Sequence, residues 1–149
     1  MSNFGKYKEK GMLFDSLEHE YDSILRPDLQ IIIRLDGISF TSKFLKLFNK
    51  ATYSIYQECM KKVTFELCAM FKSTKIAYTH TDEINLILSG KDVESNDFNR
   101  VQKILTKASS LSSALLTQYL SEKLNIDKNL SFNGLEKCSC FSAKVHNLP

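Results

Sequence analysis

The sequence lacks the patterns that would indicate a zinc site or a membrane span. It has four cysteines, but none forms a C-x-x-C pair, and no two histidines have zinc-ligand spacing. No apolar run approaches the ~20 residues of a transmembrane helix, and the N-terminal stretch MSNFGKYKEKG has no apolar signal core. We therefore expect a soluble, cytoplasmic protein with reduced thiols and without membrane contact.

The composition is that of one globular domain. The chain has 149 residues, of which 43% are hydrophobic and 25% are charged, and this is enough to bury a core without disulfides. The formal net charge of +3 is too small to indicate a nucleic-acid partner by itself. We expect residues 1–30 to form an N-terminal arm and residues 31–149 to form the domain.

The hydrophobic periodicity predicts the order β-α-β-β-α-β. Residues 31–35 are apolar on both faces, as in a central strand, and residues 44–71 and 98–124 have helical spacing. Two short strands flank THTDE at residues 79–83, and a last strand covers residues 138–146. The predicted fold class is α+β, a ferredoxin-like antiparallel sheet with two long helices on one face. Right-handed crossovers place the first and third strands side by side at its centre.

The stretch IIIRLDGISF at residues 31–40 ends an apolar strand in Asp36 and Gly37. In the predicted sheet this end lies near the hairpin that carries Asp82 and Glu83. Carboxylates at one edge repel one another unless protons or cations intervene, and a pair of Mg²⁺ ions for phosphoryl or nucleotidyl transfer would meet that need. The missing side chain of Gly37 would let a phosphate or a metal reach the backbone. From spacing alone, a capped turn and a solvated hairpin tip explain the same residues equally well.

A basic row follows on the second predicted helix, where Arg100, Lys103 and Lys107 recur at helical spacing on one flank. A basic row beside a carboxylate cluster suits the non-bridging oxygens of a triphosphate. Taken alone, the row is better explained as a solvated helix face.

Several motifs together resemble those of the histidine-tRNA guanylyltransferase family and its 3′–5′ polymerase relatives. In chain order they are RLDGISF, THTDEINLIL, FNRVQKILTKASS and CFSAKVHNLP, and the resemblance runs from about Asp15 to Pro149. It implies a catalytic domain folded like the palm of ordinary polymerases and nucleotide cyclases. It also implies addition of a nucleotide, from GTP, ATP or another nucleoside triphosphate, to the 5′ end of tRNA or a tRNA-like RNA. Two Mg²⁺ ions and a homo-oligomer (dimer or tetramer) belong to the same expectation.

The resemblance also assigns roles to individual residues. Asp36 and Asp82 match the metal-binding aspartates, with the Gly37 carbonyl as a further ligand. Glu83 matches the acidic residue after the second aspartate, so that the catalytic candidates are Asp36, Asp82 and Glu83. The residues that match nucleotide-binding positions are Asp36, Gly37, Ile38, Ser39, Phe40, Thr41, Thr81, Asp82, Arg100 and Lys103.

The chain departs from the family pattern at three positions. The family usually has His where this chain has Thr41, and its motif F-D-x-R is replaced by one with Ser142 and Lys144. Relatives also continue beyond the position of Pro149, into segments for oligomer contacts and tRNA handling. Two other functions therefore stay open: a shortened palm that binds nucleotide or RNA as a module, and a palm enzyme of another reaction such as nucleotide cyclisation.

Overall fold

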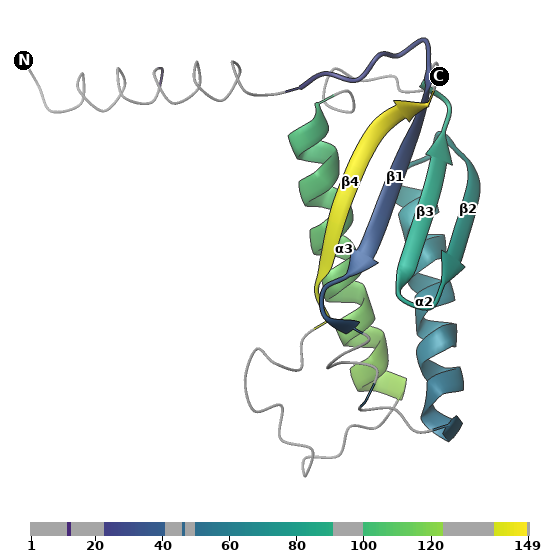
Figure 1. The fold of residues 1–149 in the computed structure, drawn as a ribbon. Helices are drawn as coiled ribbons and strands as arrows, with labels where there is room; N and C mark the ends of the chain where they lie inside the picture. Colours follow the sequence, from purple (N-terminus) through teal and green to yellow (C-terminus); the bar gives the residue numbers. More distant parts are fainter. Residues whose placement is uncertain are drawn as a thin grey trace, which may run out of the picture.

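The structure is a computed structural model that describes Met12 and residues 23–40, 46, 50–90, 100–123 and 139–148. Its elements in chain order are β1 (Gln30–Gly37), α2 (Lys50–Met70), β2 (Thr74–His80), β3 (Glu83–Leu88), α3 (Val101–Lys123) and β4 (Phe141–Leu148). The predicted α+β class and the predicted β-α-β-β-α-β order are therefore confirmed (Figure 1).

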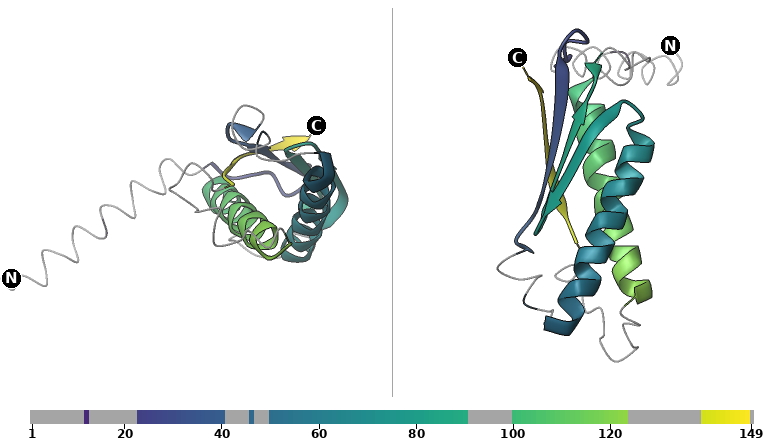
Figure 2. Two further views of the ribbon diagram at one scale, coloured as in Figure 1. Left: turned by 90° about the horizontal axis from the view of Figure 1, so that it is seen from below. Right: turned by 90° about the vertical axis from the view of Figure 1, so that its right-hand side faces the viewer.

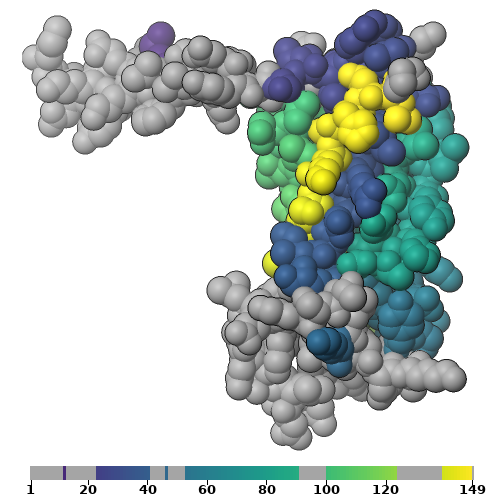
Figure 3. Space-filling view, viewed as in Figure 1, coloured from purple at the N-terminus to yellow at the C-terminus, as the bar shows by residue number. Residues whose placement is uncertain are grey.

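The strands form one antiparallel sheet with the order β2-β3-β1-β4. This is the ferredoxin-like order, with β1 and β3 side by side at the centre as predicted. Both helices cover the same face of the sheet (Figure 2). The opposite face of the sheet lies at the molecular surface, and no helix that the structure describes covers it (Figure 3). We call this second side the open face.

The core lies between the sheet and the two helices. Side chains alternate along a strand, so Ile31, Ile33 and Leu35 are fully buried against the helices, whereas Arg34 and Asp36 are exposed on the open face. The prediction of a central β1 is thus right, but β1 is buried on one face only. On the helices the buried positions recur at intervals of three and four: Tyr56, Met60, Val63 and Leu67 on α2, and Ile104, Ala108, Ser112, Leu116 and Leu120 on α3.

The predicted N-terminal arm is described only at Met12 and from residue 23 onward. Residues 23–29 lie against the domain, because Leu25 is buried in the core and Ile24 forms a β-bridge with Arg100. The backbone N–H of Arg26 donates to the side-chain oxygen of Asn147 at 2.8 Å. No helix in the described ranges is long and apolar enough to cross a membrane.

Candidate functional site

The three predicted carboxylates meet at one end of the sheet, which we call the carboxylate end. Asp36 is the last residue but one of β1 and faces Glu83, the first residue of β3, in the strand register. Asp82 lies in the hairpin between β2 and β3, and its carbonyl accepts a hydrogen bond from the backbone N–H of Gly37 at 3.1 Å. Asp36 is exposed, and Asp82 and Glu83 are half-buried. The topology thus brings these residues together as the sequence predicts.

Arg34 and Glu83 form an ion pair on the open face, between Nη2 of the guanidinium and Oε1 of the carboxylate. Among the residues that the structure describes, no ion pair involves Asp36 or Asp82. Of the three carboxylates, Glu83 therefore has its charge balanced within the chain, and Asp36 and Asp82 carry theirs towards solvent. In the described ranges no three His, Cys, Asp or Glu side chains are grouped so that they could hold a metal ion.

A buried tyrosine holds the hairpin from the helix side. The Tyr56 hydroxyl, on α2, donates to the carbonyl of Thr81 at 3.0 Å, and its side chain has no exposed surface. Burial raises the pKa of Tyr56, and the negative charge of Asp82 raises it further, so the hydroxyl stays a protonated donor. Thr81 has a left-handed backbone with φ of 50°, and its own hydroxyl donates to Oδ1 of Asp82 at 3.0 Å.

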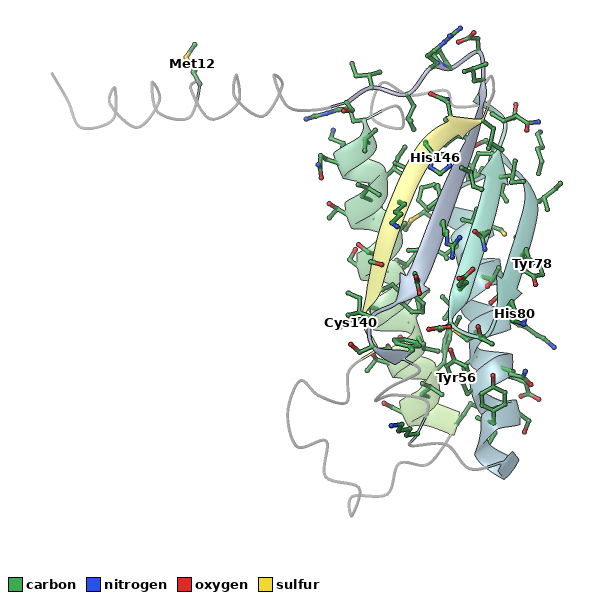
Figure 4. The ribbon with its side chains drawn as sticks, viewed as in Figure 1. Met12, Tyr56, Tyr78, His80, Cys140 and His146 are labelled. Carbon is green, nitrogen blue, oxygen red and sulfur yellow. The ribbon has the colours of Figure 1, made fainter. Side chains whose placement is uncertain are left out.

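Sequence reasoning missed Tyr56. In the sequence it lies four residues before Met60, which is a helical interval. That interval predicts burial, but it gives no partner for the hydroxyl. The partner becomes visible only when α2 is packed below the β2–β3 hairpin (Figure 4).

The turn after β1 owes its glycine to an aromatic ring. A Cβ atom added to Gly37 would lie 2.3 Å from Cγ of Phe40, which is far inside van der Waals contact. Phe40 is 1% exposed, and its ring packs against that of Phe141 with centroids 5.1 Å apart. Gly37 is therefore needed for close packing, a reason different from the predicted access of phosphate or metal to the backbone. The buried ring of Phe40 also leaves only its backbone for contact with a nucleotide.

The other predicted residues of this turn lie on the surface. Ile38 is 55% exposed, and its N–H donates to the carbonyl of Cys140 at 2.8 Å. Ser39 is exposed and has a left-handed backbone with φ of 59°. Thr41 lies outside the described residues. The turn thus offers a nucleotide the backbone and side chains of residues 38 and 39, next to the carboxylates.

Arg100 and Lys103 lie at the opposite end of the sheet from the carboxylates. Helix α3 begins beside the segment that precedes β1, where the N–H of Val101 donates to the carbonyl of Ser23 at 2.9 Å. The helix reaches the carboxylate end only near Ser113, about ten residues or ~15 Å further along its axis. The expectation that this basic row flanks the carboxylates is therefore wrong within one chain (Figure 1).

What α3 brings to the carboxylate end is a set of hydroxyls. The Ser113 Oγ accepts from the N–H of Phe141 at 3.1 Å, and the Ser139 hydroxyl donates to the Ser113 carbonyl at 3.0 Å. Thr117 and Ser139 share a further hydrogen bond of 2.7 Å. These contacts hold the start of β4, which sets Ser142 opposite Asp36. In the sequence, only the serine-rich composition of α3 indicates these hydroxyl contacts, and it does not predict which strand they reach.

Comparison with known proteins agrees with this geometry. A ferredoxin-like sheet with carboxylates at the end of its central strand is the layout of a polymerase-type palm. Residues 14–149 match the model of one family, described as tRNAHis guanylyltransferase (Thg1). The chain belongs to this family. A search of curated protein sequences found no match.

Solved structures of Thg1 proteins share the fold. A bacterial tRNA(His) guanylyltransferase (Thg1)-like protein in complex with GTP has a TM-score of 0.75 and 21% identity, over 95% of this chain and 59% of that one. For such a protein in complex with ATP the TM-score is 0.77 and the identity 22%, over 93% and 58% of the two chains. The tRNA(His) guanylyltransferase of Saccharomyces cerevisiae has a TM-score of 0.62 and 20% identity, over 88% and 56%. The chain thus spans less than two thirds of the length of these proteins.

Proposed function

We propose that the chain is a metal-dependent nucleotidyltransferase that adds a nucleotide to the 5′ end of tRNA or a related RNA, in the 3′–5′ direction. GTP, ATP or another nucleoside triphosphate supplies the nucleotide. The observation that carries the proposal is the meeting of Asp36 and Asp82 at the end of β1, in a chain whose residues 14–149 match the guanylyltransferase family. The solved relatives in complex with GTP and with ATP support the choice of nucleotide.

The donor chemistry of the carboxylate end fits Mg²⁺. This ion takes oxygen ligands and is usually held by one or two carboxylates, with waters and substrate phosphates completing the octahedron. Asp36 and Asp82 supply carboxylates that no described ion pair engages, and the Gly37 carbonyl is a third oxygen. When bound, a pair of such ions activates an attacking oxygen and stabilises a leaving one.

The chain's own residues position that site. Tyr56 and Thr81 hold the hairpin so that the Asp82 carboxylate stays beside the end of β1. Arg34 balances the charge of Glu83, which lowers the repulsion that a third carboxylate would add to the pair. The exposed turn at Ile38 and Ser39 lies next to these groups and is where we place the nucleotide.

The test is incorporation of labelled GTP into a 5′-activated tRNA in the presence of Mg²⁺. We expect Asp36→Ala and Asp82→Ala each to lower the rate by a factor of at least ~100, since losing a direct ligand exceeds the 10–100-fold cost of losing an outer partner. The matched control is Asp28→Ala, an exposed carboxylate at the opposite end of the sheet, which should leave the rate unchanged. Equal rates for the wild type, Asp36→Ala and Asp82→Ala would reject the assignment.

Two other outcomes would favour the alternative functions. GTP binding without incorporation would indicate a nucleotide- or RNA-binding module. A cyclic nucleotide formed without RNA would indicate a cyclase-like enzyme. The homo-oligomer stays a prediction, which light scattering of the purified chain measures.

A further inference from the structure

The open face of the sheet carries polar and aromatic side chains in rows that run across the strands. The register and the alternation of side chains define three rows on this face. From the carboxylate end they are Ser142–Asp36–Glu83–His80, then Lys144–Arg34–Asn85–Tyr78, then His146–Ile32–Ile87–Ile76. The first row is the candidate site described above, and the second row lies two residues away from it along each strand.

Two aromatic rings form a platform at the β2 side of these rows. Tyr78 and His80 are parallel, with an interplanar angle of 5° and centroids 6.4 Å apart. Both side chains are exposed, and Tyr78 retains 58% of its accessible surface. Figure 4 shows them one after the other along β2, with His80 nearer the hairpin. The exposed faces of these rings suit the stacking of a nucleic-acid base.

Cationic groups lie across the sheet from this platform. Lys144 on β4 is exposed and is the register partner of Arg34. Among the described residues no ion pair involves Lys144. Strands lie ~4.8 Å apart, so Lys144 and Tyr78, which are three strand spacings apart, are separated by ~14 Å. In a related arrangement, the four-stranded sheet of RNA-recognition motifs stacks two or three bases on aromatic side chains of its open face.

We propose that the open face binds an unpaired segment of the RNA, with bases stacked on Tyr78 and His80 and the phosphate backbone at Lys144. The proposal rests on the proposed function, because it delivers that RNA to the row of Asp36 and Glu83. Unpaired nucleotides fit better than a duplex, since the faces of paired bases are already covered by their neighbours in the stack. The cation at Lys144 favours a polyanion over a neutral or basic protein surface.

The test is fluorescence anisotropy with a short single-stranded RNA and with a hairpin RNA of the same length. Both titrations are done in EDTA and without nucleotide, so they do not depend on metal binding or catalysis. We expect the single strand to bind more tightly than the hairpin. Tyr78→Ala should weaken single-strand binding roughly five- to 150-fold, the equivalent of ~1–3 kcal/mol for one stacked base. Tyr78→Phe should bind as the wild type does, because it keeps the ring.

Two further variants separate stacking from charge. Ile76→Ala removes an apolar side chain that is 60% exposed on the same face, and it should leave RNA affinity unchanged. Lys144→Ala should lower the slope of log affinity against log salt by about one, as expected for a single phosphate contact. Lys61 is an exposed cation on α2, on the helix side of the sheet, and Lys61→Ala should leave that slope unchanged.

The results that would overturn the proposal are equally specific. Equal affinities of wild type and Tyr78→Ala for the single strand would exclude the platform, and so would tighter binding of the hairpin. Self-association that Tyr78→Ala abolishes while RNA affinity stays unchanged would assign the face to a protein partner instead. Because these titrations contain neither Mg²⁺ nor GTP, their failure leaves the nucleotide-transfer test of Asp36 and Asp82 unaffected.

Discussion

The two ends of the sheet are held by different kinds of contact. At the end where β1 begins, the Asn147 amide accepts from the N–H of Arg26 at 2.8 Å and donates to the Arg26 carbonyl at 2.9 Å. The N–H of Val101 adds a bond to Ser23, and Leu25 is buried in the core. The acid at that end, Asp28, is paired with Arg26, which lowers the pKa of its carboxyl.

At the carboxylate end two acids have no ion pair among the described residues, and the backbone is strained. Both non-glycine residues with a left-handed backbone in the described chain, Ser39 and Thr81, lie there. Asp36 lies three residues before Ser39, and Asp82 follows Thr81 directly; no described ion pair engages either acid. Such strain and crowded charge cost stability, and they persist at sites where function requires them. The two ends thus differ in how their acids are balanced: Asp28 is paired within the chain, whereas Asp36 and Asp82 are available to the metal ions that we propose.

The largest effect that we expect comes from alanine at the glycines of the two ends. A Cβ at Gly90 would lie 2.1 Å from the carbonyl oxygen of Leu29 and 2.6 Å from that of Pro27, so the backbone itself has to move. At Gly37 the clash is with the Phe40 ring. We expect Gly90→Ala to lower the free energy of unfolding by more than ~3 kcal/mol and Gly37→Ala by ~1–3 kcal/mol, measured by urea denaturation.

A double-mutant cycle sharpens this difference. Phe40→Ala alone should destabilise by creating a cavity, but in the Gly37→Ala background it also removes the Cγ and Cδ atoms that the new Cβ would meet. The double variant should therefore be more stable than the sum of the two single effects. Phe40→Ala should give no such rescue to Gly90→Ala, whose clash is with backbone at the other end. A Gly37→Ala protein as stable as the wild type would contradict the packing role.

A smaller effect should follow from Tyr56→Phe, which removes the bond that holds the carboxylate end from below. Losing one hydrogen bond to the Thr81 carbonyl should lower the free energy of unfolding by ~1 kcal/mol. The matched control is Tyr53→Phe on the same helix, because no hydrogen bond of the Tyr53 hydroxyl is present among the described residues. If the two variants unfold at the same urea concentration, Tyr56 does not hold the hairpin.

Tyr56→Phe should also differ from the wild type in how its stability depends on pH. Burial and Asp82 raise the pKa of Tyr56 in the folded chain, whereas an unfolded tyrosine titrates near ~10. Above pH ~10 the unfolded chain loses this proton and the folded chain keeps it, so stability falls as the pH rises. Wild type should therefore lose up to ~1.4 kcal/mol per pH unit more than Tyr56→Phe above pH ~10, and the difference between them should be constant below it.

The sequence predicts the fold and the meeting of the carboxylates for identifiable reasons. Periodicity separates the helices from the strands, and the right-handed crossover rule then leaves β1 beside β3. This places Asp36 next to Glu83 without any side-chain information. The bond of Tyr56 and the clash at Gly37 depend on distances of a few ångströms between distant segments, and no pattern in the sequence contains those distances.

The position of the basic row was predictable from the same topology, although the spacing of Arg100 and Lys103 alone misleads. Strand β3 starts at the carboxylate end and runs away from it, so α3 has to begin at the far end. About six residues of β1 at 3.3 Å each separate the two ends, a distance of ~20 Å. Helical spacing identifies a basic flank, but only the direction of the chain tells which end that flank reaches.

The smallest effect that we expect follows from the direction of α3, which begins at the end of the sheet far from the carboxylates. Because Arg100 and Lys103 lie ~20 Å from Asp36 in the same chain, Arg100→Ala and Lys103→Ala should change the KM for GTP by no more than about twofold, as for ordinary surface charges. The measurement is the rate of labelled GTP incorporation at varied GTP, with Lys61→Ala as the surface-charge control. A KM raised tenfold or more by either variant, but not by Lys61→Ala, would break the comparison between the ends. It would mean that the basic start of α3 meets the carboxylates of another copy of the chain, since within one copy the length of the sheet keeps them apart.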